Sequence, residues 1–160
     1  MKFVPDAKAN DAGGAPLVFQ MNQVEKAFLL ATLQLFPVLE DSHHHLSQDP
    51  GATGPADQRL LQQAMARQRQ QYRAKLDDFF RAQRRFFTNA QEGVQLALTA
   101  EQLEWLLQIL NDIRVGSWVQ LGCPEIDSFR RSGLTPAQTR AVAAMDMSGY
   151  FQAALLEAVK

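Results

Sequence analysis

Apolar residues recur at helical spacing along the second half of the chain, most clearly between Glu104 and Leu121. The period is close to the 3.6 residues of an α-helix, and the apolar positions cover most of the circumference. A helix of this kind needs neighbours on several sides, so we expect it at the centre of the fold. Its expected inner residues are Trp105, Leu106, Leu107, Ile109, Leu110, Ile113, Trp118 and Val119.

A second helical pattern extends from Asp57 to Phe87, where Gln, Arg, Ala and Leu dominate and no residue breaks a helix. Its apolar residues fall within about 100° of one another, which predicts an amphipathic helix with one inner face. That face consists of Leu61, Met65, Tyr72, Leu76, Phe79, Phe86 and Phe87.

Short β-compatible runs lie at Lys2 to Val4, Leu17 to Met21 and Val94 to Leu98. The last two runs each lead into a helix that begins with a capping box, so a unit of strand, cap and helix occurs twice, 77 residues apart. In this repeat Phe19 corresponds to Leu96, Met21 to Leu98, Asn22 to Thr99, Phe28 to Trp105, Leu29 to Leu106, Leu30 to Leu107 and Leu33 to Leu110.

Two further helices have clear starts. The helix after Asn22 ends or kinks at Pro37, and its expected inner face is Val24, Ala27, Phe28, Ala31 and Leu35. The helix after Thr135, with Pro at its first position, extends to about Val159. Gly149 near its middle predicts a close backbone contact, and its expected inner residues are Ala141, Met145, Tyr150, Phe151, Leu155 and Val159.

These patterns predict a mainly α-helical protein, residues 1–160 forming one helical domain. We expect a bundle of three to four principal helices with a small N-terminal β-hairpin, extended to a three-stranded β-element by residues 94–98. A flexible loop is expected at about 40–56, because proline and glycine there break both helix and strand.

Composition narrows the setting of the protein. The formal net charge of -1 gives no general attraction to nucleic acid or acidic membranes. The single cysteine, Cys123, cannot form an intramolecular disulfide. The most apolar segment, Ala27 to Leu39, is too short to cross a bilayer, which takes about 20 residues. We therefore expect a cytoplasmic protein that does not associate with membranes.

Charge is unevenly distributed, however. Residues 57–87 contain eight basic and three acidic side chains, so this segment is about +5 and the remainder about -6. Two interpretations of this charge are open: the basic face of the helix binds a polyanion, or it is solvated and balanced by acids of neighbouring elements. Residues 125–143 also resemble a helix-turn-helix, the basis of a nucleic-acid-binding hypothesis, although Arg140 is the only basic residue of its second helix before Lys160. The basic face of the helix predicted at 57–87 comprises Arg59, Arg67, Arg73, Arg81, Arg84 and Arg85.

Three polar residues, Asn111, Asp112 and Arg114, interrupt the apolar pattern of the central helix. Burying such groups costs several kcal/mol unless they are paired. Two interpretations are open. In the first, Asp112 accepts hydrogen bonds from Arg114 or from another helix, and the polar residues form a structural network. In the second, the three residues form one wall of a small-molecule pocket, with Trp118 as its apolar partner.

Catalytic sets are otherwise missing from the sequence. The histidines are contiguous at 43–45, and the Glu-x-x-His spacing of Glu40 and His43 has no second copy, which a di-iron bundle requires. No phosphate-binding glycine loop, Cys-x-x-Cys pair or nucleophile elbow is present. We therefore expect no cofactor, no metal and no enzymatic activity. The favoured hypothesis is an interaction or adaptor protein with a protein partner or a homo-oligomeric state.

Several short segments resemble an uncharacterised family of bacterial proteins, a mainly helical domain of unknown function. The family has no established activity. Genes for such proteins can lie beside one for an adaptor of an ATP-dependent protease, so the resemblance associates the chain with protein turnover. It is carried by Leu17-Val18-Phe19-Gln20-Met21, Val94 to Leu98, Leu110-Asn111-Asp112-Ile113-Arg114 with Gly116, Leu121-Gly122, and Tyr150-Phe151.

Overall fold

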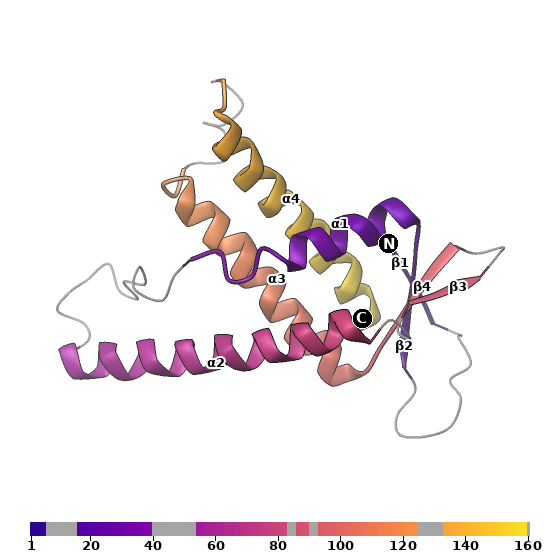
Figure 1. Ribbon diagram of the computed structural model, residues 1–160, viewed down its shortest axis with the longest axis horizontal. Coiled ribbons are helices and arrows are strands. Elements are labelled where there is room, and N and C mark those ends of the chain that lie inside the picture. Colours follow the sequence, from indigo (N-terminus) through magenta and orange to yellow (C-terminus); the bar gives the residue numbers. More distant parts are fainter. Residues whose placement is uncertain (6–15, 40–53, 83–85, 90–92, 125–132, 160) are drawn as a thin grey trace.

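The computed structural model describes residues 1–5, 16–39, 54–82, 86–89, 93–124 and 133–159. The fold is mainly α-helical with one small sheet, which confirms the predicted class (Figure 1). The helices are α1 (Gln23–Leu33), α2 (Pro55–Arg81), α3 (Ala100–Gln120) and α4 (Pro136–Leu156), followed by a 3₁₀ turn, η4 (Glu157–Val159). The strands are β1 (Lys2–Val4), β2 (Leu17–Met21), β3 (Phe86–Asn89) and β4 (Gly93–Leu98).

The four strands form an antiparallel sheet in the order β1-β2-β4-β3. The expected hairpin and its pairing with β4 are confirmed, but the expectation of a helix continuing to Phe87 is wrong. α2 ends at Arg81, and residues 86–89 pair with β4 instead. The Phe-Phe-Thr sequence of β3 favours a strand, and its backbone satisfies the outer edge of β4.

The strand order reflects the internal repeat. Each half of the sheet consists of a hairpin followed by a capped helix, and the halves meet at the β2–β4 pair, where Phe19 lies opposite its repeat equivalent Leu96. In the outer strands Phe3 pairs with Phe19, and Phe86 pairs with Leu96. Both predicted capping boxes are present, with Asn22 and Glu25 in α1 and Thr99 and Gln102 in α3.

The core is centred on α3. Ile109, Leu110 and Ile113 are fully buried. α4 packs along α3 (Figure 1), and its buried positions Ala144 and Ser148 are small, which permits a close approach of the two helices. From α2, the Phe79 ring meets the Trp105 ring edge-on with centroids 5.8 Å apart. The central position predicted for α3 is therefore correct.

Residues expected to face inward are exposed in each of the four described helices; in α2 this is Leu61, which is 46% exposed. In α1 the buried residues are Leu29, Thr32 and Leu33, whereas every residue assigned to its inner face is exposed, including Val24 and Phe28. Because α1 carries apolar residues on both sides, its pattern does not decide which side faces the core. In α4 and the turn after it, the exposed residues that were expected inside are Tyr150 and Val159; at the end of α3, Trp118 and Val119 are likewise exposed.

A close backbone contact involves Gly116 rather than Gly149. A Cβ atom added at Gly116 would lie 2.9 Å from Cβ of Val38, whereas one added at Gly149 meets no atom within 4 Å. The segment after α1 is thus seated directly on α3, where Gln120 Nε2 also donates to the Val38 carbonyl at 3.1 Å. The expectation for Gly149 is wrong, because the face of α4 at that position is open.

The two glycines give opposite predictions for substitution by alanine. Gly116→Ala is expected to lower the free energy of unfolding by about 1 to 3 kcal/mol, because the new methyl overpacks against Val38. Gly149→Ala is expected to raise it by about 0.5 to 1 kcal/mol, because alanine costs less chain entropy inside a helix. Urea denaturation of both variants measures this difference; equal effects would contradict the placement of Val38 on α3.

Candidate functional site

A cleft of about 600 Å³ lies between α2 and α3 and is closed on one side by the segment after α1. Its volume is within the range of small-molecule and peptide-side-chain sites. The apolar walls come from Phe36, Leu39, Met65, Leu107 and Val115. The polar lining residues are Gln68, Arg69, Tyr72, Gln108, Asn111 and Asp112.

An ion pair between Arg69 of α2 and Asp112 of α3 joins the two helices that form this cleft. Nε and Nη2 of Arg69 donate to Oδ2 of Asp112 at 3.2 and 3.0 Å. Only 8% of the Arg69 side chain and 22% of the Asp112 side chain are exposed. The two side chains carry opposite charges and are largely out of water. Together they therefore add no net charge to the cleft.

The two carboxylate oxygens of Asp112 differ in their hydrogen bonding. Oδ1 is buried and accepts no hydrogen bond from the described residues. A buried carboxylate oxygen without a partner costs free energy, because it has lost water and gained nothing in exchange. Asp112 is itself a lining residue. Asp112 therefore brings to the cleft lining a carboxylate whose second oxygen has no hydrogen-bond donor among the described residues.

Side-chain amides also line the cleft. Gln68 Nε2 donates to the Tyr72 hydroxyl at 3.1 Å and to Gln108 Oε1 at 3.3 Å, and the Tyr72 hydroxyl also donates to Gln108 Oε1. The two bonds to Gln108 connect α2 to α3. Asn111 adds an exposed amide beside Asp112. An amide carries both a donor and an acceptor, as a peptide bond does.

The structure separates the four residues that the sequence grouped together. Asn111 and Asp112 line the cleft, but Arg114 and Trp118 are not among its lining residues. Asp112 pairs with Arg69 and not with Arg114, which is exposed. Trp118 is 38% exposed, and its Nε1 donates to the Pro124 carbonyl at 3.2 Å.

Arg69 was not predicted as the partner of Asp112. Its position offered a signal, because Arg69 lies off the basic face and next to the inner positions Met65 and Tyr72, four residues before it and three after it. Lys75, also off that face, bonds Glu101 of α3 at 2.9 Å. Two basic residues of α2 are therefore balanced by acids of α3.

The basic face itself is only partly described. Arg59, Arg67, Arg73 and Arg81 are exposed on α2, whereas Arg84 and Arg85 lie outside the described residues. Outside them also lie the loop predicted at 40–56, except for its last three residues, and the segment 125–132 of the proposed helix-turn-helix.

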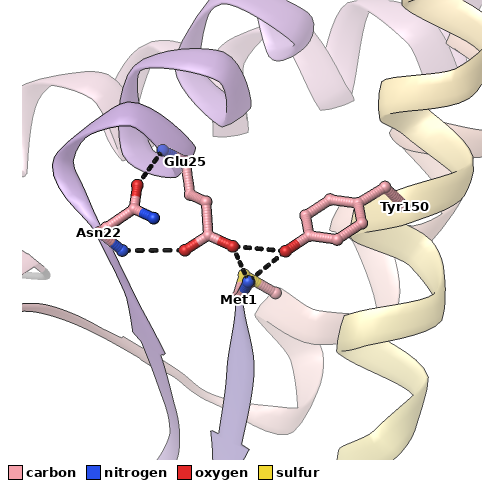
Figure 2. A network of polar contacts seen from close by, with 4 residues as sticks. All are labelled: Met1, Asn22, Glu25 and Tyr150. Carbon is pink, nitrogen blue, oxygen red and sulfur yellow. Dashed lines mark hydrogen bonds and ion pairs between the residues drawn. The ribbon is translucent and has the colours of Figure 1, made fainter.

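A second polar cluster ties the N-terminus to two helices (Figure 2). The Met1 amine donates to Oε1 of Glu25 in α1 and to the hydroxyl of Tyr150 in α4, and that hydroxyl donates to the same Glu25 oxygen. Oε2 of Glu25 accepts from the Asn22 backbone N–H at 2.9 Å. The sequence pattern predicts only the capping box at this helix start, and the contacts of Met1 have no periodic pattern that would predict them.

The cluster shifts the pKa of two of its members. Burial acts to raise the pKa of Glu25, but hydrogen bonds from the Met1 amine, Tyr150 and the Asn22 backbone outweigh it and lower the pKa to about 2. For Tyr150, the hydrogen bond to Glu25, then burial and the Glu25 charge, raise the pKa to about 12. The carboxylate and the neutral phenol are thus the forms that stabilise the fold.

The chemistry of the described residues is otherwise limited. They contain no group of three or more His, Cys, Asp or Glu side chains arranged to hold a metal ion, and His43 to His45 lie outside them. None of their helices has both the length and the apolar character needed to span a bilayer.

Comparison with family models, with curated proteins and with solved structures finds no match to this chain. The resemblance to an uncharacterised bacterial family therefore stays a prediction.

Loss of the Asp112 carboxylate tests the ion pair. Asp112→Ala is expected to lower the free energy of unfolding by about 2 kcal/mol, the usual size of a hydrogen bond to a charged group. This is less than the about 3 to 5 kcal/mol for breaking a fully buried pair, because Arg69 has a further interaction. Urea denaturation measures the change, with Arg114→Ala as a control that should alter little. A change below about 0.5 kcal/mol in Asp112→Ala, typical of surface substitutions, would contradict the pair.

Acid titration tests the N-terminal cluster. Since the pKa of Glu25 falls from 4.5 to about 2 on folding, its contribution is full above pH 4.5 and is lost as the pH falls towards 2. The destabilisation of Glu25→Gln relative to wild type should therefore be large at pH 7 and small near pH 2. The glutamine oxygen can still accept from the Asn22 backbone N–H, and the substitution removes the charge and the acceptor that face Met1 and Tyr150. Glu104→Gln, at an exposed position, is the control; a pH-independent effect of Glu25→Gln would contradict the cluster.

Proposed function

We propose that this protein is a non-enzymatic interaction protein that binds a segment of a partner polypeptide in the cleft between α2 and α3. The observation that carries the proposal is Asp112, a lining residue of an apolar-walled cleft, whose buried Oδ1 accepts no hydrogen bond from the described residues. A backbone or side-chain N–H of the guest would satisfy it.

The charge of the cleft supports a neutral donor. Arg69 already balances the charge of Asp112, so a cationic guest gains little net attraction there. A peptide N–H is neutral and meets the acceptor without adding a buried charge. The amides of Gln68, Gln108 and Asn111 match the alternating donors and acceptors of a peptide backbone.

The walls of the cleft support an apolar side chain on the guest. Met65 and Leu107 face it from the two helices, and Phe36 and Leu39 from the segment after α1. Burial of one large apolar side chain contributes about 1.5 to 3 kcal/mol. Together with the backbone bonds, this describes a short segment with one apolar anchor rather than a rigid metabolite.

The test uses a displayed library of short peptides selected against the purified protein, followed by calorimetric titration of the selected sequences. Asp112→Asn is the informative variant. Arg69 only donates, so the asparagine turns its carbonyl oxygen towards it and places an NH₂ donor where Oδ1 was. Selected peptides should bind this variant at least about tenfold more weakly, a loss of about 1.4 kcal/mol. They should bind Arg114→Gln, changed outside the cleft lining, as they bind wild type.

Two results would contradict the proposal. Peptides that bind Asp112→Asn as tightly as wild type would place the binding surface elsewhere. A library without binders, combined with thermal stabilisation of wild type but not of Asp112→Asn by a compound from a metabolite library, would replace the peptide with a small molecule as the guest.

A further inference from the structure

The outer side of α1 is an exposed surface without charge. Its apolar stripe consists of Val24, Phe28 and Ala31 in α1 and Leu35 in the turn that follows. Val24 is 61% exposed, Phe28 52% and Leu35 47%. The spacing of four, three and four residues places the stripe within about 60° of the helix circumference. Large apolar side chains gathered in this way on a surface mark an interaction site.

The two charged residues of α1 do not interrupt this surface. Glu25 is turned towards the Met1 amine and Tyr150 (Figure 2), and Lys26 places its Nζ 4.7 Å from the centre of the Phe86 ring. The remaining exposed residues of the α1 segment are Asn22, Gln23, Ala27 and Gln34, none of them charged. A second apolar surface can therefore approach without desolvating an ion.

The internal repeat indicates what kind of element fits there. Advanced by 77 residues, the stripe corresponds to Glu101, Trp105, Gln108 and Asp112 of α3. Each of these four residues contacts α2. Glu101 pairs with Lys75, and Trp105 packs against Phe79. Gln108 bonds Gln68 and Tyr72, and Asp112 pairs with Arg69. The equivalent side of α3 is thus the side on which a helix docks. By the repeat, the stripe on α1 is a helix-docking surface as well.

The stripe is complementary to itself. When two α1 helices lie antiparallel about a two-fold axis between positions 29 and 30, Val24 of one chain meets Leu35 of the other, and Phe28 meets Ala31. The large ring of Phe28 is then opposite the smallest side chain of the stripe, and each contact occurs twice. We propose that this surface binds a second copy of the chain, forming a two-fold symmetric dimer through antiparallel α1 helices.

The size of the surface sets the expected affinity. α1 has 11 residues, so it is about 16 Å long, and two such helices bury less than the about 1,200 Å² of a standard interface. The dimer should therefore be a weak one, with a dissociation constant in the micromolar range. This interface uses the side of α1 away from the core and does not depend on the cleft between α2 and α3.

Sedimentation equilibrium of the full chain over a range of concentrations, about 1 µM to about 1 mM, tests the proposal. Wild type should approach twice the monomer mass at the upper end. Phe28→Glu should raise the dissociation constant at least about tenfold, as expected for a central aromatic anchor. Leu60→Glu makes the same kind of change at an exposed position of α2 and should leave the constant unchanged. Circular dichroism melts confirm that each variant is folded.

A charge exchange tests the antiparallel pairing. Val24→Glu and Leu35→Lys should each weaken self-association. In either variant the Val24–Leu35 contact, which occurs twice in the dimer, then places a charged side chain against an apolar one. An equimolar mixture of the two variants should associate better than either alone, since one contact becomes a Glu–Lys pair and the other remains Val24 on Leu35. Antiparallel pairing predicts this recovery, whereas parallel pairing places Val24 beside its own copy.

Three results would overturn the proposal: a monomer throughout the concentration range, a dimer insensitive to Phe28→Glu, or no recovery in the mixture. Because peptide binding to Asp112→Asn is measured separately, failure of the dimer leaves the proposed function of the cleft untouched.

Discussion

The fold depends on the burial of α3, a helix that is apolar around most of its circumference. Ile109, Leu110 and Ile113 have no exposed surface, and each such side chain contributes about 1.5 to 3 kcal/mol when it leaves water. No single neighbour can cover such a helix. α4 covers one side through small residues, α2 covers another through Phe79, and the segment after α1 reaches the backbone at Gly116. The cleft lies where α2 and this segment meet α3, so it is a consequence of how the central helix is covered.

Local signals in the sequence were sufficient for most of the fold. Capping boxes, the proline of α4 and the alternation of Val94, Leu96 and Leu98 act over a few residues, and the structure has each of them. The pairing of residues 94–98 with the N-terminal hairpin was also predicted, because one short strand is not stable alone. Predictions failed where local preference was ambiguous. Phe86 fits the helical pattern of α2 as well as a strand, and only the open edge of β4 decides between them. α1 is apolar on two sides, and the choice of its buried side belongs to the tertiary structure.

The candidate site shows the same division between local and long-range information. Position 112 in the middle of an apolar helix indicated that Asp112 needs a partner, because a carboxylate there is costly to leave unpaired. The partner, Arg69, is 43 residues away in sequence, and its identity depends on how α2 crosses α3. The cluster at Met1 is harder still to foresee, since it joins Met1, the residue before β1, to Glu25 of α1 and Tyr150 of α4, and no local pattern relates these three residues.

The two helices of the repeat present different chemistry on equivalent sides, and the difference agrees with the proposed dimer, in which the docking partner of α1 belongs to another molecule. α2 belongs to the same chain as α3, so its effective concentration is high, and polar contacts of modest strength such as Lys75–Glu101 and Tyr72–Gln108 accompany the burial of Phe79 against Trp105. An element that arrives from another molecule has no such advantage and loses translational and rotational freedom on binding. Apolar burial is the contribution that offsets this cost without demanding exact polar geometry. The stripe at Val24 and Phe28 has that character, whereas its counterpart on α3, where Glu101 replaces Val24, does not.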